Sequence, residues 1–150
     1  PCSFLSLILL VIVPFLFTAD QRYAEYEARQ HAIEREHERY LADLQKLDSS
    51  IHLNPELSAH YLERSRLKRS HGRWKEALRD AELAISLEKT MDGYWELGWC
   101  QEHLGNLDEA ARTYQSAHAI DSMGEWAKVR LEVVNRRISE ENRSTNEDTK

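Results

Sequence analysis

The chain of 150 residues begins with an apolar segment that differs from everything after it. Residues 2–19 contain no charged side chain. As a helix, this segment would be about 27 Å long, close to the roughly 30 Å apolar core of a bilayer. We therefore expect a transmembrane helix over residues 2–19. The apolar side chains of this anchor are Phe4, Leu5, Leu7, Ile8, Leu9, Leu10, Val11, Ile12, Val13, Phe15, Leu16 and Phe17.

A secretory signal peptide is the competing interpretation of this segment. The apolar part of such a peptide usually spans about 7–15 residues, and Phe17, Thr18 and Ala19 make a poor small-x-small cleavage site. A retained, single-pass anchor is the better prediction. Neither the membrane nor the orientation follows from the sequence, since the positive-inside rule needs the loops on both sides.

Residues 20–52 form a charged segment without Gly or Pro, which predicts a long juxtamembrane helix. Mostly large side chains recur there at alternating spacings of three and four, the 3.5-residue period of a coiled-coil seam. This stripe consists of Tyr23, Tyr26, Gln30, Ile33, His37, Tyr40, Leu44 and Leu47. The helix would act as a stalk. Its stripe would pack either on a second copy of the chain, in self-association, or on the chain's own folded domain.

Two stretches in the second half of the chain repeat each other at an offset of 33 residues. The first contains Tyr61, Ser65, Gly72, Trp74, Ala77, Ala81 and Ala84, and the second contains Tyr94, Gly98, Gly105, Leu107, Ala110, Tyr114 and Ala117. A fixed period of this size is typical of helix-turn-helix solenoids. The small Ser65 and Gly98 let a second helix approach closely, and Gly72 and Gly105 permit a tight turn between helices.

With these markers the chain resembles the tetratricopeptide repeat (TPR) family. The shared pattern is an aromatic residue, a small residue four later, a turn glycine and two alanines seven apart. The resemblance covers residues 58–90 and 91–123 and implies a short helical solenoid. Three positions depart from the family pattern: Ala81 replaces an aromatic residue, and Lys89 and Ser122 replace the proline that usually closes a repeat.

The segments beside the repeats complete a domain over residues 53–138. Asn54 and Pro55 suit the N-cap and the first position of a helix. Amphipathic residues 124–138 predict a capping helix that covers the last apolar face of the solenoid. The polar tail, residues 139–150, is predicted to be disordered.

Composition supports an all-α class and excludes some functions. The chain has only five Gly and three Pro, too few for the many tight turns of an all-β fold. Its formal net charge of −6 argues against a nucleic-acid binder. Cys2 and Cys100 show no CxxC or Cys/His ligand spacing, and the histidines show no HxxxH or HExxH pattern. We predict neither catalysis, nor a cofactor, nor a metal site.

The TPR resemblance implies protein–protein binding through the surface lined by the first helix of each pair. The positions that would face this groove are Ala59, Leu62, Glu63, Arg66, Arg69, Ser70, Asp92, Trp95, Glu96, Trp99, Glu102 and His103. Because Trp and Arg are enriched at interface hot spots, we predict a partner-binding groove formed by Arg66, Arg69, Trp95, Trp99 and Glu102. Trp74 and Trp126 are predicted to pack in the core or between repeats.

Some TPR proteins grip the C-terminal carboxylates of chaperones through Lys and Asn at set groove positions. Those positions hold Leu62, Arg66 and Trp99 here, so we do not expect that activity.

Charge is segregated along the repeats. Residues 63–75 carry six basic side chains and one acidic one, whereas residues 92–109 carry five acidic side chains and no Lys or Arg. This arrangement could orient a dipolar partner or face anionic lipid headgroups. A solvated face that keeps the domain soluble is the simpler explanation of the same pattern.

These features together favour a membrane-anchored scaffold or adaptor that holds a protein partner or helps to assemble a membrane complex. The alternatives are a permanent accessory subunit of a large membrane complex and a targeting receptor. The sequence identifies no partner.

Overall fold

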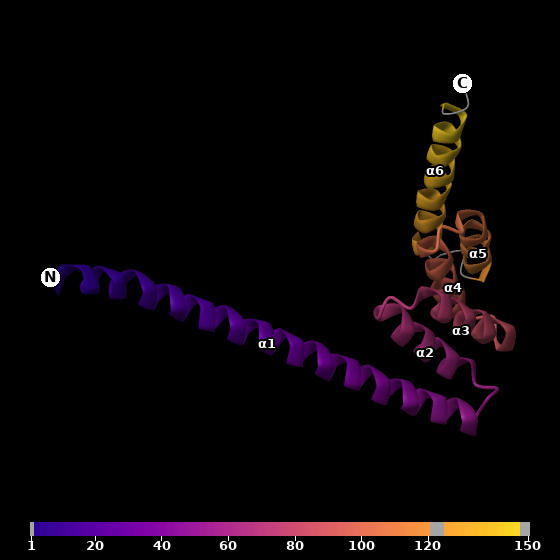
Figure 1. Ribbon diagram of the computed structural model, residues 1–150. Coiled ribbons are helices and arrows are strands. Elements are labelled where there is room, and N and C mark those ends of the chain that lie inside the picture. The colour runs from indigo at the N-terminus through magenta and orange to yellow at the C-terminus, as the bar shows by residue number, and fades with distance from the viewer. Residues whose placement is uncertain (1, 121–124, 148–150) are drawn as a thin grey trace. The chain divides into compact units, whose positions relative to one another are not determined.

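The computed structural model describes the backbone of residues 2–120 and 125–147 and the side chains of residues 20–120 and 125–144. All the regular elements within these ranges are helices, as the all-α prediction requires (Figure 1). They are α1 (Cys2–Leu53), α2 (Ser58–Ser70), α3 (Trp74–Leu87), α4 (Met91–His103), α5 (Leu107–Ile120) and α6 (Glu125–Glu147).

The chain divides into two units, Pro1–Asp43 and Leu44–Lys150. In the first unit, residues 20–39 of α1 are exposed to solvent throughout. Among the helices formed by residues with described side chains, none is long and apolar enough to cross a membrane. The anchor predicted over residues 2–19 lies outside those residues.

The second unit is a series of helical hairpins in which each helix from α2 to α6 contacts the next along the chain (Figure 1). Gly72 follows α2 with φ of 72°, and Gly105 follows α4 with φ of 82°. Glycine adopts this left-handed conformation without the steric penalty of a Cβ atom, so each glycine ends one helix and reverses the chain. The hairpins α2–α3 and α4–α5 fall within the two sequence repeats.

Small side chains line the contacts between these helices. Ala77, Ala81 and Ala84 of α3 are buried, and so are Ala110 and Ala117 of α5. Because an alanine side chain ends at Cβ, neighbouring helices can pack closely over it. The alanines of the repeat pattern are therefore core residues.

Helix α6 covers the end of the solenoid, as expected of a capping helix. Its Val134 is fully buried in a cluster with Tyr114 of α5. The other members of this cluster are Leu107, Ala110 and Ala111, and the half-buried side chains packed against it are Trp95, Trp126, Leu131 and Ile138. Trp126 thus packs against the core, as predicted.

The end of α6 differs from the prediction. The helix runs to Glu147 instead of ending at Ile138, so the polar segment from Ser139 is helical over most of its length. Residues 139–147 contain no Gly or Pro that would end a helix. The Oγ atoms of Ser139 and Ser144 donate hydrogen bonds to main-chain carbonyls of the preceding turn, at 2.8 and 2.9 Å.

Gly98 supplies a test of the close packing between α4 and α5. A Cβ atom at Gly98 would lie 2.6 Å from Cε1 and 2.9 Å from Cζ of the buried Tyr114 ring. Gly98→Ala should therefore lower the free energy of unfolding by about 1–3 kcal/mol, because a rigid ring must move. The measurement is urea denaturation followed by circular dichroism.

Gly93→Ala is the matched control in the same helix. Its Cβ would meet Cδ1 at the free end of the Ile85 side chain, 2.6 Å away, and this end can turn aside. Alanine also gains up to about 1 kcal/mol of helix propensity over glycine. The stability of Gly93→Ala should stay within about 1 kcal/mol of the parent protein. Equal losses in both variants would contradict the packing argument.

Candidate partner-binding face

Helices α2 and α4, the first helices of the two hairpins, contact each other and are joined by ion pairs. Nη2 of Arg66 donates to Oδ2 of Asp92 at 2.9 Å, and Nε of Arg69 donates to Oε1 of Glu96 at 2.7 Å. Arg66, Arg69, Asp92, Trp95 and Trp99 together form what we call the α2–α4 face. All five are predicted to face the groove, four of them as partner-binding residues, and the structure brings them onto adjoining helices.

Glu96 lies beneath this face and is completely buried, with an exposed fraction of 0%. Its Oε1 atom accepts a hydrogen bond from Arg69 and lies 3.3 Å from Oγ of Ser65. The Ser65 hydroxyl also lies 2.8 Å from the main-chain carbonyl of Ala77, to which it can donate instead. Among the described residues, its Oε2 atom has no hydrogen-bond partner, and Nε of Arg66 is 4.0 Å away. The groove position predicted for Glu96 is therefore wrong, because its carboxylate points into the protein.

The tryptophans of α4 form an aromatic group that continues to α6. The guanidinium carbon of Arg69 lies 4.2 Å from the centroid of the Trp99 ring, which is a cation–π contact. Trp99 meets Trp95 edge-on at 5.4 Å, and Trp95 meets Trp126 edge-on at 4.4 Å. Both Trp95 and Trp99 are half-buried, so each keeps part of its ring on the surface.

A shallow pocket lies next to these rings. Met91, Asp92, Trp95 and Trp126 line it, and its volume is about 290 Å³. Among the described lining residues the walls are mainly apolar, and Asp92 contributes a carboxylate. A pocket of this composition suits one apolar or aromatic side chain of a bound protein segment.

Glu102, also predicted for the groove, lies elsewhere. It is only 7% exposed and interacts with α6 through Arg130 and through Nη1 of Arg137 at 3.1 Å. The hydroxyl of Tyr114 also donates to Glu102, at 3.2 Å. Helix α6 covers Glu102, so the open α2–α4 face does not include it. Burial, followed by the Glu102 charge, raises the pKa of Tyr114.

Trp74 packs between the repeats, as predicted. Its ring stacks on His103 at the end of α4, with the centroids 3.6 Å apart and an angle of 14° between the planes. Although His103 is exposed, this stacking occupies one face of its ring. His103 thus links the two hairpins.

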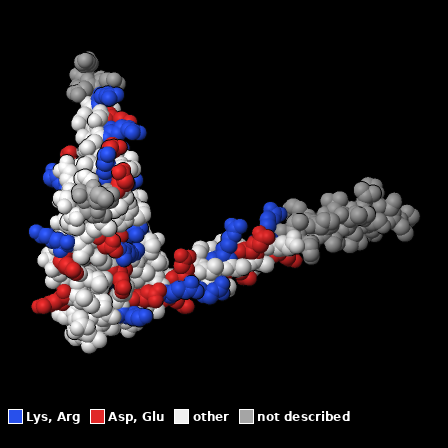
Figure 2. Space-filling view, turned by 180° about the vertical axis from the view of Figure 1, so that it is seen from behind, with Lys and Arg blue, Asp and Glu red and all other residues white. Residues whose placement is uncertain are grey.

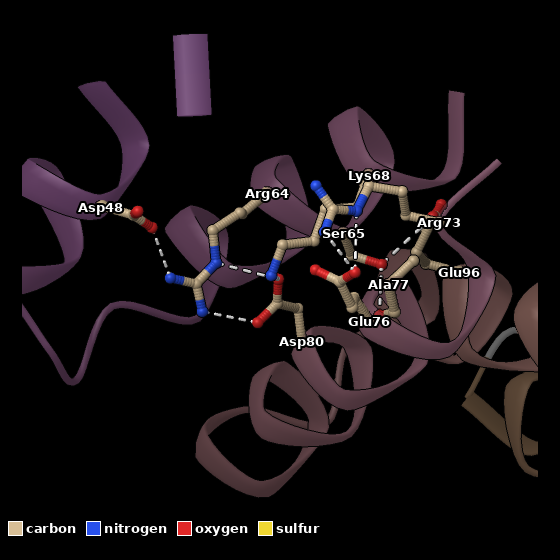
Figure 3. A network of polar contacts seen from close by, with 9 residues as sticks. All are labelled: Asp48, Arg64, Ser65, Lys68, Arg73, Glu76, Ala77, Asp80 and Glu96. Carbon is tan, nitrogen blue, oxygen red and sulfur yellow. Dashed lines mark hydrogen bonds and ion pairs between the residues drawn. The ribbon is translucent and has the colours of Figure 1, made fainter. Parts of the chain in front are cut away.

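A second buried ionic cluster joins α2, α3 and the last turns of α1 (Figure 3). Asp80 accepts from Nε and Nη2 of Arg64, at 2.9 and 2.6 Å, and from Nζ of Lys68 at 2.7 Å. Nη1 of Arg64 donates to Asp48 of α1 at 2.7 Å. The hydrogen bond to Asp80 is the main reason that the pKa of Arg64 lies above its ordinary value.

These contacts change the interpretation of the segregated charges. Five of the six basic residues in residues 63–75 form ion pairs within the chain. On the face shown in Figure 2, basic and acidic side chains lie interspersed. Arg66 and Arg69 join the two hairpins, Arg64 and Lys68 join the two helices of the first hairpin, and Arg73 pairs locally with Glu76.

Cys100 lies in the interior close to the Glu96 carboxylate and is completely buried. Burial, followed by the Glu96 charge, raises the pKa of the Cys100 thiol to about 12. A thiol held neutral is a poor nucleophile. No group of three His, Cys, Asp or Glu side chains in the described part of the chain is placed to hold a metal ion.

Sequence reasoning missed Glu96 and Asp80 as internal anions. Their partners lie 12 to 31 residues away in the sequence. The block of basic residues in α2 was the available signal, because Arg and Lys side chains that become half-buried on folding need carboxylates nearby.

No protein-family model and no curated protein matches the sequence. Solved structures do match the fold. The first TPR domain of Spaghetti (RPAP3), bound to the HSP90 peptide SRMEEVD, is 16% identical over 69% of this chain and 85% of that one, with a TM-score of 0.64.

Two further structures show the same likeness. The Sgt2 TPR domain from Aspergillus fumigatus is 21% identical over 71% of this chain and 72% of that one, with a TM-score of 0.65. PcrH, in complex with the chaperone binding region of PopD, is 20% identical over 80% of this chain and 92% of that one, with a TM-score of 0.61. These likenesses show that the chain has a TPR-type fold.

Asp80→Asn tests the ionic cluster. The substitution removes the anion but leaves Arg64 and Lys68 in a largely buried site, so the free energy of unfolding should fall by about 3 kcal/mol. Glu109→Gln is the control, since it breaks only an exposed ion pair with Arg112 at 3.8 Å and should change stability by less than about 1 kcal/mol.

Chemical denaturation of both variants provides the measurement. Replacing the whole group, with Arg64→Met, Lys68→Met and Asp80→Leu, should recover much of the loss because no unpaired charge then stays buried. If Asp80→Asn were as stable as Glu109→Gln, the cluster would not contribute as described.

A second prediction concerns the reactivity of the Cys100 thiol, measured in a Cys2→Ser background. The folded protein should resist iodoacetamide at pH 9, whereas the protein in urea should react rapidly, as followed by mass spectrometry. Folding raises the pKa of this thiol from 9.0 to about 12. Below pH 9 the thiol is neutral in both states and the free energy of unfolding is unaffected. Between pH 9 and 12 only the unfolded protein loses the proton, so the free energy of unfolding decreases as the pH rises. Equal reaction rates with and without urea would show that the thiol is accessible.

Proposed function

We propose that this protein is a membrane-anchored scaffold whose repeat domain binds a segment of another protein on the α2–α4 face. Residues 2–19 would hold the chain in the membrane, and α1 would carry the repeat domain away from it. Support for the anchor comes from the eighteen uncharged residues of this segment, whose length suits a bilayer core. Support for binding comes from the surface of the repeat domain.

The observation that carries this proposal is the pair of half-buried tryptophans beside an apolar pocket. Trp95 and Trp99 are already fixed by neighbouring aromatic rings and by Arg69. A rigid aromatic surface loses little conformational entropy when a partner binds to it. The adjoining pocket, lined by Met91, Asp92, Trp95 and Trp126, gives one partner side chain a place to be buried.

Charged groups of both signs border this aromatic centre. Asp92 is exposed, and Arg66 beside it is more exposed than Arg69. An apolar centre with a polar border is the usual construction of a protein interface. The favoured partner is therefore a peptide segment with an apolar or aromatic anchor residue between charged residues.

Protein ligands of structurally similar domains are consistent with this class of function. The Spaghetti (RPAP3) domain is bound to an HSP90 peptide, and PcrH is bound to a region of PopD. The present chain has Leu62, Arg66 and Trp99 at the positions where some TPR proteins grip a C-terminal carboxylate. An internal segment is for this reason the better candidate ligand.

A permanent place in a membrane complex is the second candidate function. It is favoured by Leu83 and Leu87, two large apolar side chains that lie exposed one turn apart on α3. They belong to a different helix from the α2–α4 face. A subunit held for life in a complex would bury such a pair.

Trp99→Ala tests the first candidate against the second. The full chain would be extracted in mild detergent from the cells that make it, and bound proteins would be quantified by mass spectrometry. If Trp99 is a hot spot worth about 2 kcal/mol, recovery of the partner should fall roughly 30-fold. Trp99→Phe, which keeps an aromatic ring beneath Arg69, should retain more of the partner.

Leu83→Ala is the matched variant on α3. It should leave recovery unchanged if the α2–α4 face is the binding site. If Leu83→Ala lost the partner while a folded Trp99→Ala retained it, the α2–α4 face would not be the binding site. That result would favour the second candidate function, a permanent subunit of a membrane complex. Circular dichroism checks that each variant is folded.

A further inference from the structure

The exposed part of α1 carries a stripe of large side chains. Tyr23, Tyr26 and Ile33 have exposed fractions of 64%, 59% and 59%. All three lie at the a and d positions of the heptad pattern. A single helix of about twenty residues is marginally stable in water, and exposed apolar stripes of this kind usually mark a missing partner.

The exposed stripe ends at a definite place. Tyr40 is only 3% exposed, and Leu44 and Leu47 are half-buried. The stripe available to a partner therefore extends from Tyr23 to His37.

The charges beside the stripe indicate what covers it. With Tyr23 and Gln30 at a, the g positions of residues 20–37 hold Arg22, Arg29 and Glu36, and the e positions hold Asp20, Glu27 and Glu34. In a parallel two-stranded coiled coil, each g residue faces the e residue five positions further along the other strand. Arg22 would face Glu27 of a second copy, and Arg29 would face Glu34. Symmetry forms each pair twice.

An antiparallel arrangement has less of this complementarity. There e positions face e positions, so Glu27 and Glu34 of one strand would oppose glutamates of the other. Basic and acidic side chains are interspersed along the described part of α1 (Figure 2). The placement of arginines at g positions and glutamates at e positions therefore favours parallel strands over antiparallel ones.

We infer that a second copy of this chain covers the stripe, and that the two stalks form a parallel, in-register coiled coil through residues 20–37. The amides of the two Gln30 side chains face each other at an a position and hydrogen-bond across the seam. Such a buried polar pair fixes the register at some expense of stability. The seam spans about two and a half heptads, so the association is weak in dilute solution and stronger where chains are concentrated. The inference does not rest on the proposed function.

Disulfide trapping tests the orientation in the full chain, in detergent and in a Cys2→Ser background. Cys100 is fully buried and does not interfere. Tyr26→Cys lies at a d position, where two parallel strands bring the thiols within bonding range, whereas Ala28→Cys lies at the outer f position. Under mild oxidation, Tyr26→Cys should form covalent dimers several-fold faster than Ala28→Cys. Equal rates would overturn the inference.

Charge exchange tests the seam with its aromatic residues intact. Arg29→Glu or Glu34→Arg alone places like charges across the dimer and should weaken it by about tenfold, measured by sedimentation equilibrium. Mixing the two variants should restore association as a heterodimer, because each pair again joins opposite charges. Arg35→Glu, at an outer f position, is the control and should have no effect.

Two results would contradict the proposed pairing. One is a failure of the two exchanged chains to prefer each other over themselves. The other is a loss in Arg35→Glu equal to that in Arg29→Glu, which would indicate a general charge effect. Circular dichroism shows whether any variant has lost its helix.

Discussion

The α2–α4 face depends on the ion pair between Arg69 and the buried carboxylate of Glu96. A fully buried carboxylate is costly unless a cation and hydrogen bonds compensate it, and Arg69 supplies both from the neighbouring hairpin. The same guanidinium covers one face of Trp99. One contact therefore joins the two repeats and fixes the ring that the candidate site presents.

The aromatic group extends this constraint to the end of the domain. Trp99 contacts Trp95, and Trp95 contacts both Tyr114 of α5 and Trp126 of α6. The capping helix is consequently part of the site as well as a cover for the core, since it forms one wall of the pocket.

The fold could be predicted from the sequence because its determinants recur at fixed positions. The turn glycines and core alanines each follow from local geometry and from the 33-residue period. The burial of Glu96 and Glu102 could not be predicted in this way, since it depends on arginines 27 to 35 residues away. The disorder predicted for the tail from its polar composition was wrong for residues 139–147, which continue α6. These residues contain no Gly or Pro that would end the helix.

Helix α1 has two roles that change along its length. Asp48 binds Arg64, and Leu44 and Leu47 are half-buried, so the last turns of α1 belong to the repeat domain. The exposed residues before Tyr40 form the stripe for which a second copy of the chain is proposed as the partner. A parallel stalk would place two α2–α4 faces in one particle, and binding two sites of a partner assembly raises the effective affinity without new contacts. A modest binding face of two repeats could then be sufficient, because the stalk supplies the second copy.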